Sequence, residues 1–192
     1  REQIIAWGGE VRFGARFEGM EFEDGRIVAV RGSQRQEDGT REKFVLPASD
    51  VVLACGHSAR DVFDRVRNAG LLMERKPFAV GVRIEHPQKL IDKAQYGNAA
   101  GHPALGAADY KMAVHLRNDR SVYTFCMCPG GEVMCSASEL GGVVGNGASR
   151  HARNGRNANA ALLVNVEDRD LRGDDVLAGV KLQRRMETAA YR

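Results

Sequence analysis

The stretch Ser121–Ser149 constrains the fold more than any other part of this sequence. It holds three of the four cysteines and six of the 22 glycines, has no Lys or Arg, and is charged only at Glu132 and Glu139. A surface loop normally carries more charge, whereas glycines let a backbone come close to a ligand or to another segment. We predict strands over Ser121–Cys128 and Glu132–Ser136, joined antiparallel through Pro129-Gly130-Gly131, and a glycine-rich edge over Gly141–Gly147.

Alternating and short apolar runs predict strands in most of the chain. A hairpin is expected within Val11–Val30, because apolar runs flank Asp24-Gly25 and Asp-Gly is a strong two-residue turn signal. The polar segment Gly32–Lys43 should be an exposed connection. Four further runs are predicted as strands: Phe44–Leu46, Val51–Ala54, Phe78–Ile84 and Lys111–Leu116. Together with the apolar run Ala160–Val166, they predict an α+β fold of mostly antiparallel sheets.

Helix start signals add to this pattern, and the chain divides in two. Pro87 suits the first turn of a short helix that ends near Tyr96, and Asp174 can cap a closing helix. The character of the sequence changes between residues 70 and 76. We therefore expect a β-rich part over residues 1–72 and an α+β part over residues 73–192.

One segment is suited to an anionic ligand. Val51–Ala54 is typical of a buried strand, and it leads through the tight turn Cys55-Gly56-His57-Ser58 into a helix. Ser58 and Asp61 resemble a capping box, and Gly70 marks the left-handed end of that helix. The first amides of a helix are unpaired and lie at its positive dipole end, so this turn can approach a pyrophosphate or ribose. The same residues also suit an ordinary capped helix.

Composition argues against several classes of protein. The net charge is only +3 at pH 7, with Lys and Arg scattered among Asp and Glu, so we expect no nucleic-acid partner. No run approaches the roughly 18 apolar residues of a membrane span, and no signal-peptide pattern opens the chain. We therefore expect a cytoplasmic protein with free thiols and no membrane partner. The chain opens on Arg1 and closes on the helical pattern Met186–Arg192, and we interpret it as a piece of a longer protein.

Several separated motifs carry a family resemblance. Val51–Asp61 resembles the strand-plus-glycine motif of flavoproteins with two dinucleotide-binding domains. Four later segments resemble a narrower group, the bacterial and largely uncharacterised FAD-dependent dehydrogenases of the NAD(P)/FAD-dependent oxidoreductase superfamily. These segments are Lys76–Pro87, Ala94–Gly97, Phe125–Gly131 and His151–Asn159. The resemblance covers most of residues 44–192.

The resemblance implies a cofactor and a domain arrangement. It implies FAD, the end of an FAD-binding domain over residues 1–72, and a cap or substrate domain, ferredoxin-like in fold, over residues 73–192. By the same resemblance, five residues approach the FAD of the whole protein: Gly56, His57, Ser58, Gly130 and Gly131. The Gly-x-Gly-x-x-Gly unit that opens the family's FAD domain does not occur in this sequence, so we expect the chain alone to bind FAD weakly or not at all.

Cys126 and Cys128 admit three interpretations. Beside a flavin, the pair could act as a redox dithiol or contact a substrate. With Cys135 and a histidine it could bind zinc, although Cys-x-Cys on a strand lacks the usual ligand loop and we predict no metal site. Free cysteines are also common as small buried apolar residues. Strand alternation would place the two thiols on one face.

The histidines and one charged pair are weaker signals. His151 is the best candidate proton donor, because it lies in a Gly- and Asn-rich segment of the kind that borders sites. His57 beside Ser58 resembles a nucleophile constellation only in composition, since a triad depends on arrangement in space. Arg83 and Glu85 lie on one strand face and are predicted to form a surface pair.

The function that we predict is that of a flavin-dependent oxidoreductase, in which this chain supplies a cap domain and one cofactor-contacting turn. The catalytic candidates are His151, Cys126 and Cys128. A non-catalytic α+β binding module is the alternative. The expected partners are the rest of a parent chain and a small-molecule substrate that the sequence does not identify. An exposed surface left by the missing domain would favour a homodimer.

Overall fold

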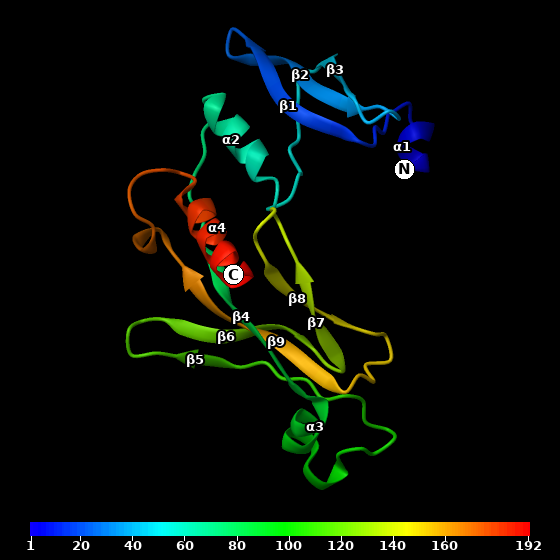
Figure 1. Ribbon diagram of the computed structural model, residues 1–192, viewed down its shortest axis with the longest axis vertical. Coiled ribbons are helices and arrows are strands. Elements are labelled where there is room, and N and C mark those ends of the chain that lie inside the picture. The colour runs from blue at the N-terminus through cyan, green and yellow to red at the C-terminus, as the bar shows by residue number, and fades with distance from the viewer. The chain divides into compact units, whose positions relative to one another are not determined.

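The computed structural model describes all residues 1–192 and divides them into two compact units, Arg1–Met73 and Glu74–Arg192 (Figure 1). Each unit combines antiparallel strands with short helices, so the predicted α+β class is confirmed. None of the helices has the length and apolar character that crossing a bilayer requires.

The N-terminal unit is a three-stranded sheet in the order β1-β2-β3 with two helices. Its elements are α1 (Glu2–Ala6), β1 (Ala15–Glu23), β2 (Arg26–Arg35), β3 (Arg41–Pro47) and α2 (Arg60–Asn68). The predicted hairpin is confirmed, because β1 and β2 join at Asp24 and Gly25, both with left-handed φ (+47° and +75°). The exposed connection predicted over Gly32–Lys43 is wrong. There β2 pairs with β3, and a Cβ at Gly32 would overlap the Phe44 ring opposite it.

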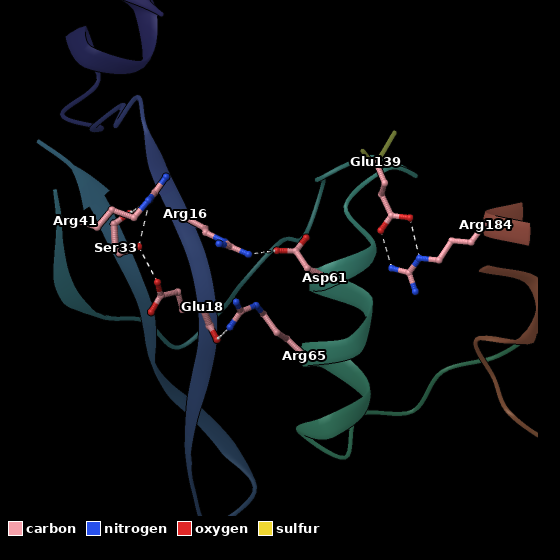
Figure 2. Close-up of polar contacts among 8 residues, drawn as sticks. All are labelled: Arg16, Glu18, Ser33, Arg41, Asp61, Arg65, Glu139 and Arg184. Atoms are coloured by element: carbon pink, nitrogen blue, oxygen red, sulfur yellow. Dashed lines mark hydrogen bonds and ion pairs between the residues drawn. The ribbon is translucent and has the colours of Figure 1, made fainter. Parts of the chain in front are cut away.

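Polar contacts hold helix α2 beside β1 (Figure 2). Arg16 donates to Asp61 Oδ2 at 2.7 Å, and Arg65 Nη1 donates to the carbonyl oxygen of Glu18 at 2.7 Å. The hydrogen bond from Arg16 lowers the pKa of Asp61. The Ser33 hydroxyl donates to Glu18 Oε1 at 2.7 Å and lowers the pKa of that carboxyl. Sheet and helix are therefore joined by charged groups on the helix and on the strand.

The end of α2 has the predicted glycine signal. Gly70 has a left-handed φ of +75°. Its amide donates to Arg67 O at 3.0 Å, and the Leu71 amide donates to Val66 O at 3.3 Å. These two bonds define a Schellman end, which satisfies carbonyl groups that a helix leaves unpaired.

The C-terminal unit is built on a four-stranded antiparallel sheet in the order β4-β9-β6-β5, with a separate β7–β8 ribbon. Its strands are β4 (Phe78–Pro87), β5 (Ala113–His115), β6 (Ser121–Cys128), β7 (Gly131–Ser136), β8 (Val144–Ser149) and β9 (Asn157–Val166). Its helices are α3 (Gln88–Tyr96), α4 (Ala178–Tyr191) and the short 3-10 helices η1 (Gly97–Ala99) and η2 (Asp168–Asp170). The apolar run Ala160–Val166 lies in β9, a central strand whose Ala158, Ala160 and Val166 are buried (Figure 1).

Two local predictions for this unit are wrong. β6 does not pair with β7: its ladder with β9 is irregular between Phe125 and Cys128, and β7 pairs with β8 instead. The glycine-rich edge predicted over Gly141–Gly147 overlaps β8, which pairs with β7 alone. Helix α4 begins at Ala178 rather than after Asp174, and its first turn is preceded by a bond from the Leu177 amide to Asp175 Oδ1 at 3.0 Å.

The sheet also differs from the ferredoxin-like sandwich that the resemblance implies. That motif runs βαββαβ. Here the β7–β8 ribbon stands between β6 and β9 where the second helix would be, and α4 follows β9. The six glycines of Ser121–Ser149 disfavour a helix in this position, because each glycine in a helix interior costs about 1 kcal/mol relative to alanine.

Helix α4 is tied to the loop between β7 and β8 (Figure 2). Arg184 donates to both oxygens of Glu139, from Nε at 2.8 Å and from Nη2 at 2.7 Å. The Val143 amide donates to the carbonyl oxygen of Glu187 at 3.2 Å. A bidentate pair fixes orientation as well as distance, so the loop is held against the helix in one geometry.

An arginine–carboxylate pair lies between the start of β6 and η2. Arg120 donates from Nη1 and Nη2 to the two oxygens of Asp170, and the Glu167 amide donates to Asp170 Oδ2 at 2.8 Å. The Arg120 hydrogen bond first, and then the Glu167 amide, lower the pKa of Asp170 from 3.8 to about 2. A carboxyl whose pKa is lower in the folded state stabilises the fold above its unfolded pKa. That contribution is lost as the pH falls through the folded pKa.

Asp170→Asn should therefore lower the stability of the C-terminal unit at neutral pH, and the deficit should shrink as the pH falls from 3.8 to about 2. Thermal unfolding followed by circular dichroism at several pH values measures the deficit. Asp174→Asn is the control, because it removes the same charge from an exposed carboxylate that makes no hydrogen bond. A deficit of constant size at every pH would contradict the prediction.

Candidate functional site

The turn predicted to approach an anionic ligand, Gly56–Ser58, lies exposed in the N-terminal unit. The strand predicted before it, Val51–Ala54, is wrong, because this segment has no regular structure and Val52 is 91% exposed. A strand needs a neighbour for its backbone groups, and the sheet of this unit ends at β3 without pairing this run. Gly56 has a left-handed φ of +76°, and a Cβ built there would meet nothing within 4 Å. The turn is therefore open on its outer side.

The predicted capping pair of helix α2 is wrong. The N-cap is Ala59, without a side-chain cap, and Asp61 bonds instead to Arg16. An ion pair with β1 has replaced the local cap. The Ser58 hydroxyl lies 3.3 Å from His57 Nε2, so these two candidate side chains touch each other. Asp61 does not orient His57, and the three residues form no catalytic triad.

The two candidate cysteines of the C-terminal unit lie at the irregular end of β6. Cys126 is exposed and has a left-handed φ of +48°, whereas Cys128 is buried. The prediction that both thiols share a face is wrong, because the irregularity after Phe125 breaks the alternation of the strand. All four cysteines are free thiols. No group of three or more His, Cys, Asp or Glu could hold a metal ion, so the zinc interpretation lacks a ligand set.

Arg83 of β4 connects this end of β6 with β9. Its guanidinium donates to the carbonyl oxygen of Cys126 at 3.1 Å and to Asn159 Oδ1, and its Nη1 lies 3.8 Å from Cys128 Sγ. Asn159 is fully buried, and its Nδ2 and the Arg83 Nε are buried without a hydrogen-bond partner. Gly147 of β8 covers the group, since a Cβ there would overlap Arg83 Nη1 and come 2.8 Å from Cys128 Sγ. We call Arg83, Cys128, Gly147 and Asn159 the Arg83 cluster.

The predicted surface pair of Arg83 and Glu85 is wrong. Glu85 accepts hydrogen bonds from the Val133 amide at 3.0 Å and from Asn157 Nδ2 at 2.6 Å, so it connects β4 to β7 and β9. The sequence did not predict that Asn159 is buried or that the half-buried Arg83 has an enclosed Nε. A signal existed, because each is a polar residue beside apolar positions on a strand that pairs along its whole length.

Gly130 and Gly131 are buried, and packing within the chain requires both to be glycine. Gly130 has a left-handed φ of +54°, and a Cβ there would overlap the carbonyl oxygen of Arg153. A Cβ at Gly131 would lie 2.5 Å from the carbonyl oxygen of Ala148. The absence of side chains at these positions thus has a structural reason that involves no cofactor. Their predicted contact with FAD stays a prediction.

His151 lies in a tight turn that the Arg153 amide closes by donating to Arg150 O at 2.9 Å. Its side chain is exposed and makes no hydrogen bond. The Gly155 amide donates to Gly130 O at 3.2 Å, so the segment that carries His151 packs against the glycine turn after β6. The chain therefore brings the His151 segment and Gly130 together. The Gly56–Ser58 turn belongs to the other unit.

Comparison with known proteins gives two matches. Residues 77–192 match a family model described as FAD-dependent protein, C-terminal domain-like. A protein of Clostridium beijerinckii, described as uncharacterized, is 43% identical over 195 residues, which cover 100% of this chain and 34% of that protein. The chain thus spans about a third of the length of the curated relative that it matches.

Proposed function

Because this chain belongs to the family of FAD-dependent proteins with this C-terminal domain, we propose that it contributes the cap or substrate domain of a flavin-dependent oxidoreductase. The C-terminal unit, which contains the matched residues 77–192, would be the cap. The N-terminal unit would form part of the FAD-binding domain. The match of the family model to most of the C-terminal unit is the observation that carries the proposal.

The segment before the Gly56 turn supports a place for the N-terminal unit within a larger sheet. Val52 is 91% and Leu53 is 40% exposed, although both are apolar. Exposed contiguous apolar side chains mark a surface that another segment or molecule covers. We propose that Val51–Ala54 becomes a strand when the FAD-binding domain is complete, which would bring the Gly56–Ser58 turn to the carboxyl end of a paired strand, where α/β sheets bind ligands.

The residues of this turn fit a one-sided contact with FAD. Gly56 leaves its outer side open, and the side chains of His57 and Ser58 are exposed at the surface. Their hydroxyl and imidazole groups can donate hydrogen bonds to a ribose or phosphate oxygen. When bound, FAD would supply hydride transfer, which no side chain can perform.

In the cap, the exposed residues differ in role from the buried ones. His151 makes no hydrogen bond within the chain, so either ring nitrogen can hold the proton that it would donate to a substrate. Cys126 presents an exposed thiol, whereas Cys128 is buried in the Arg83 cluster and would position its neighbours. We therefore assign substrate contact to Cys126 and His151, and support to Cys128.

A visible absorption spectrum tests the flavin proposal. The full-length protein should carry flavin absorbance after purification, whereas the 192-residue chain should be colourless, because one turn contacts only part of so large a cofactor. A stoichiometrically yellow 192-residue chain would refute the second expectation. A folded but colourless full-length protein would favour the non-catalytic binding module instead.

Paired variants of the full-length protein test the turn itself. His57→Ala with Ser58→Ala should lower the amount of bound flavin. His115→Ala with Ser121→Ala removes a similar contact, 2.7 Å between Nδ1 and Oγ, from the C-terminal unit and should leave the flavin content unchanged. Equal flavin content in both double variants would remove this turn from the cofactor site.

A further inference from the structure

A groove of about 890 Å³ opens in the C-terminal unit outside the Arg83 cluster. It lies between the start of α3, the loop around Leu105 and the segment Ala152–Arg156. Small-molecule sites have volumes of roughly 300–1,000 Å³, so the groove is large enough for a metabolite. The segment Ala152–Arg156 lies within one of the motifs that carry the family resemblance, but neither the resemblance nor the proposed flavin contact assigns a ligand to this groove.

The charged side chains of this groove are mostly cationic and unpaired. Lys89, Arg153 and Arg156 line it, and none of them makes an ion pair or a side-chain hydrogen bond within the chain. Asp92 is the one carboxylate in the lining, and its Oδ1 already accepts from Gln88 Nε2 at 2.7 Å and from the Ala108 amide at 2.9 Å. Three cations against one engaged carboxylate leave an excess of positive charge in a concave site, which attracts anions.

One buried glutamine fixes the walls of the groove. Gln88 is 5% exposed and donates from Nε2 to the carbonyl oxygen of Ala108 at 2.9 Å. Its Oε1 accepts from the Gly130 amide at 2.8 Å, and its own amide donates to Arg156 O at 3.0 Å. Through its side chain and its backbone amide, Gln88 therefore links helix α3 to the 101–108 loop, the glycine turn and the 152–156 segment. Such pre-organisation lowers the cost of binding a ligand.

Arg153 is held in an uncommon conformation at this groove. Its φ is +48°, in the left-handed region that arginine rarely adopts. A Cβ at Gly155 would overlap Gly130 O, so the chain around Arg153 closes directly onto the buried glycine turn. Backbone strain of this kind persists where the surrounding structure enforces it, and it is frequent at ligand-binding sites.

We propose that this groove binds a small organic anion. A phosphate or carboxylate head would bond to Arg153 and Arg156, whose planar guanidinium groups suit both oxyanions. Lys89 would add a third positive charge, and an apolar body would lie along Leu105 and Ala107. The proposal concerns residues of the C-terminal unit alone and does not depend on flavin binding.

Titrations of the isotope-labelled 192-residue chain, followed by heteronuclear NMR, test this proposal with three probes: phenyl phosphate, benzoate and neutral benzyl alcohol. At least one of the two anions should cause saturable shifts at amides of the groove, such as Gly101 and Gly155. Tighter binding of phenyl phosphate would identify a phosphate head, and tighter binding of benzoate a carboxylate head. Arg153→Gln and Arg156→Gln should each weaken binding by about tenfold, as expected for loss of a charge-assisted hydrogen bond.

Arg150→Gln is the matched control, because Arg150 is an exposed arginine of the same turn that does not line the groove. It should bind the anion as the parent does. Lys89→Gln provides a further variant on a helix, in case a change in the turn disturbs folding, and it should also weaken binding. Equal binding of benzyl alcohol, shifts that never saturate, or an equal loss in Arg150→Gln would overturn the proposal.

Discussion

Gly130→Ala should destabilise the C-terminal unit by about 2–5 kcal/mol. An alanine in the left-handed region costs roughly 1–2 kcal/mol, and overpacking a filled interior adds about 1–3 kcal/mol. Both costs apply here, because Gly130 has φ +54° and its Cβ would overlap the Arg153 carbonyl oxygen. The Gly130 backbone cannot move away freely, because its amide donates to Gln88 Oε1 and its carbonyl oxygen accepts from the Gly155 amide.

Gly141→Ala separates the two costs. Gly141 has φ +76°, but a Cβ there would meet nothing within 4 Å. Only the backbone term applies, so the loss should be about 1–2 kcal/mol. Hydrogen exchange at the amides of β9 measures each change, and the amides of β2 in the other unit serve as an internal reference. Equal losses in the two variants would mean that the turn relaxes around the new methyl group.

Arg83→Met should destabilise the same unit by about 1–3 kcal/mol, the cost of leaving a buried polar group without its partner. Arg83 donates to Asn159 Oδ1 and to the Cys126 carbonyl, and Asn159 has no exposed surface through which water could replace the guanidinium. Chemical denaturation followed by the β9 amides measures the loss. Arg169→Met is the control, because Arg169 pairs with Glu167 on an exposed surface and should contribute about 0–1 kcal/mol.

A double-mutant cycle distinguishes the hydrogen bond from simple packing. Asn159→Leu removes the buried amide, so Arg83→Met in that background should cost less than in the parent. The coupling between the two sites should exceed about 0.5 kcal/mol, the usual limit for independent positions. Additive losses would show that Arg83 and Asn159 contribute separately, and would contradict the role assigned to the Arg83 cluster.

Elements with strong local signals could be predicted from the sequence. Asp24-Gly25 predicted the β1–β2 hairpin, because this pair readily adopts the left-handed conformation of a tight turn. The alternation of Phe78–Ile84 followed by Pro87 predicted β4 and the start of α3, and the alternation of Ser121–Cys128 predicted β6. Each of these elements depends on residues that are neighbours in the sequence, so a short segment is enough to predict it.

Pairing between distant segments could not be predicted in the same way. β7 pairs with β8 rather than with β6, and Cys126 near the end of β6 has a left-handed φ that its side chain does not favour and that no local pattern predicts. Val51–Ala54 has the composition of a buried strand, but a strand forms only where another strand presents its backbone. The Arg83 cluster and the groove around Gln88 could not be predicted for the same reason. Arg83 bonds to Asn159, and Gln88 bonds to Gly130, which are partners far along the chain.

By itself, the sequence determined the α+β class, the family and the importance of the stretch Ser121–Ser149. Glycine conformations, turn pairs and strand alternation are local properties, so each can be predicted from one short segment of the sequence. Only the tertiary structure decided what the glycines of that stretch approach: Gly130 meets Arg153, and Gly147 covers Arg83 and Cys128. A glycine indicates that another group can come close to the backbone at that position. Which group does so depends on how segments far apart in the sequence pack together.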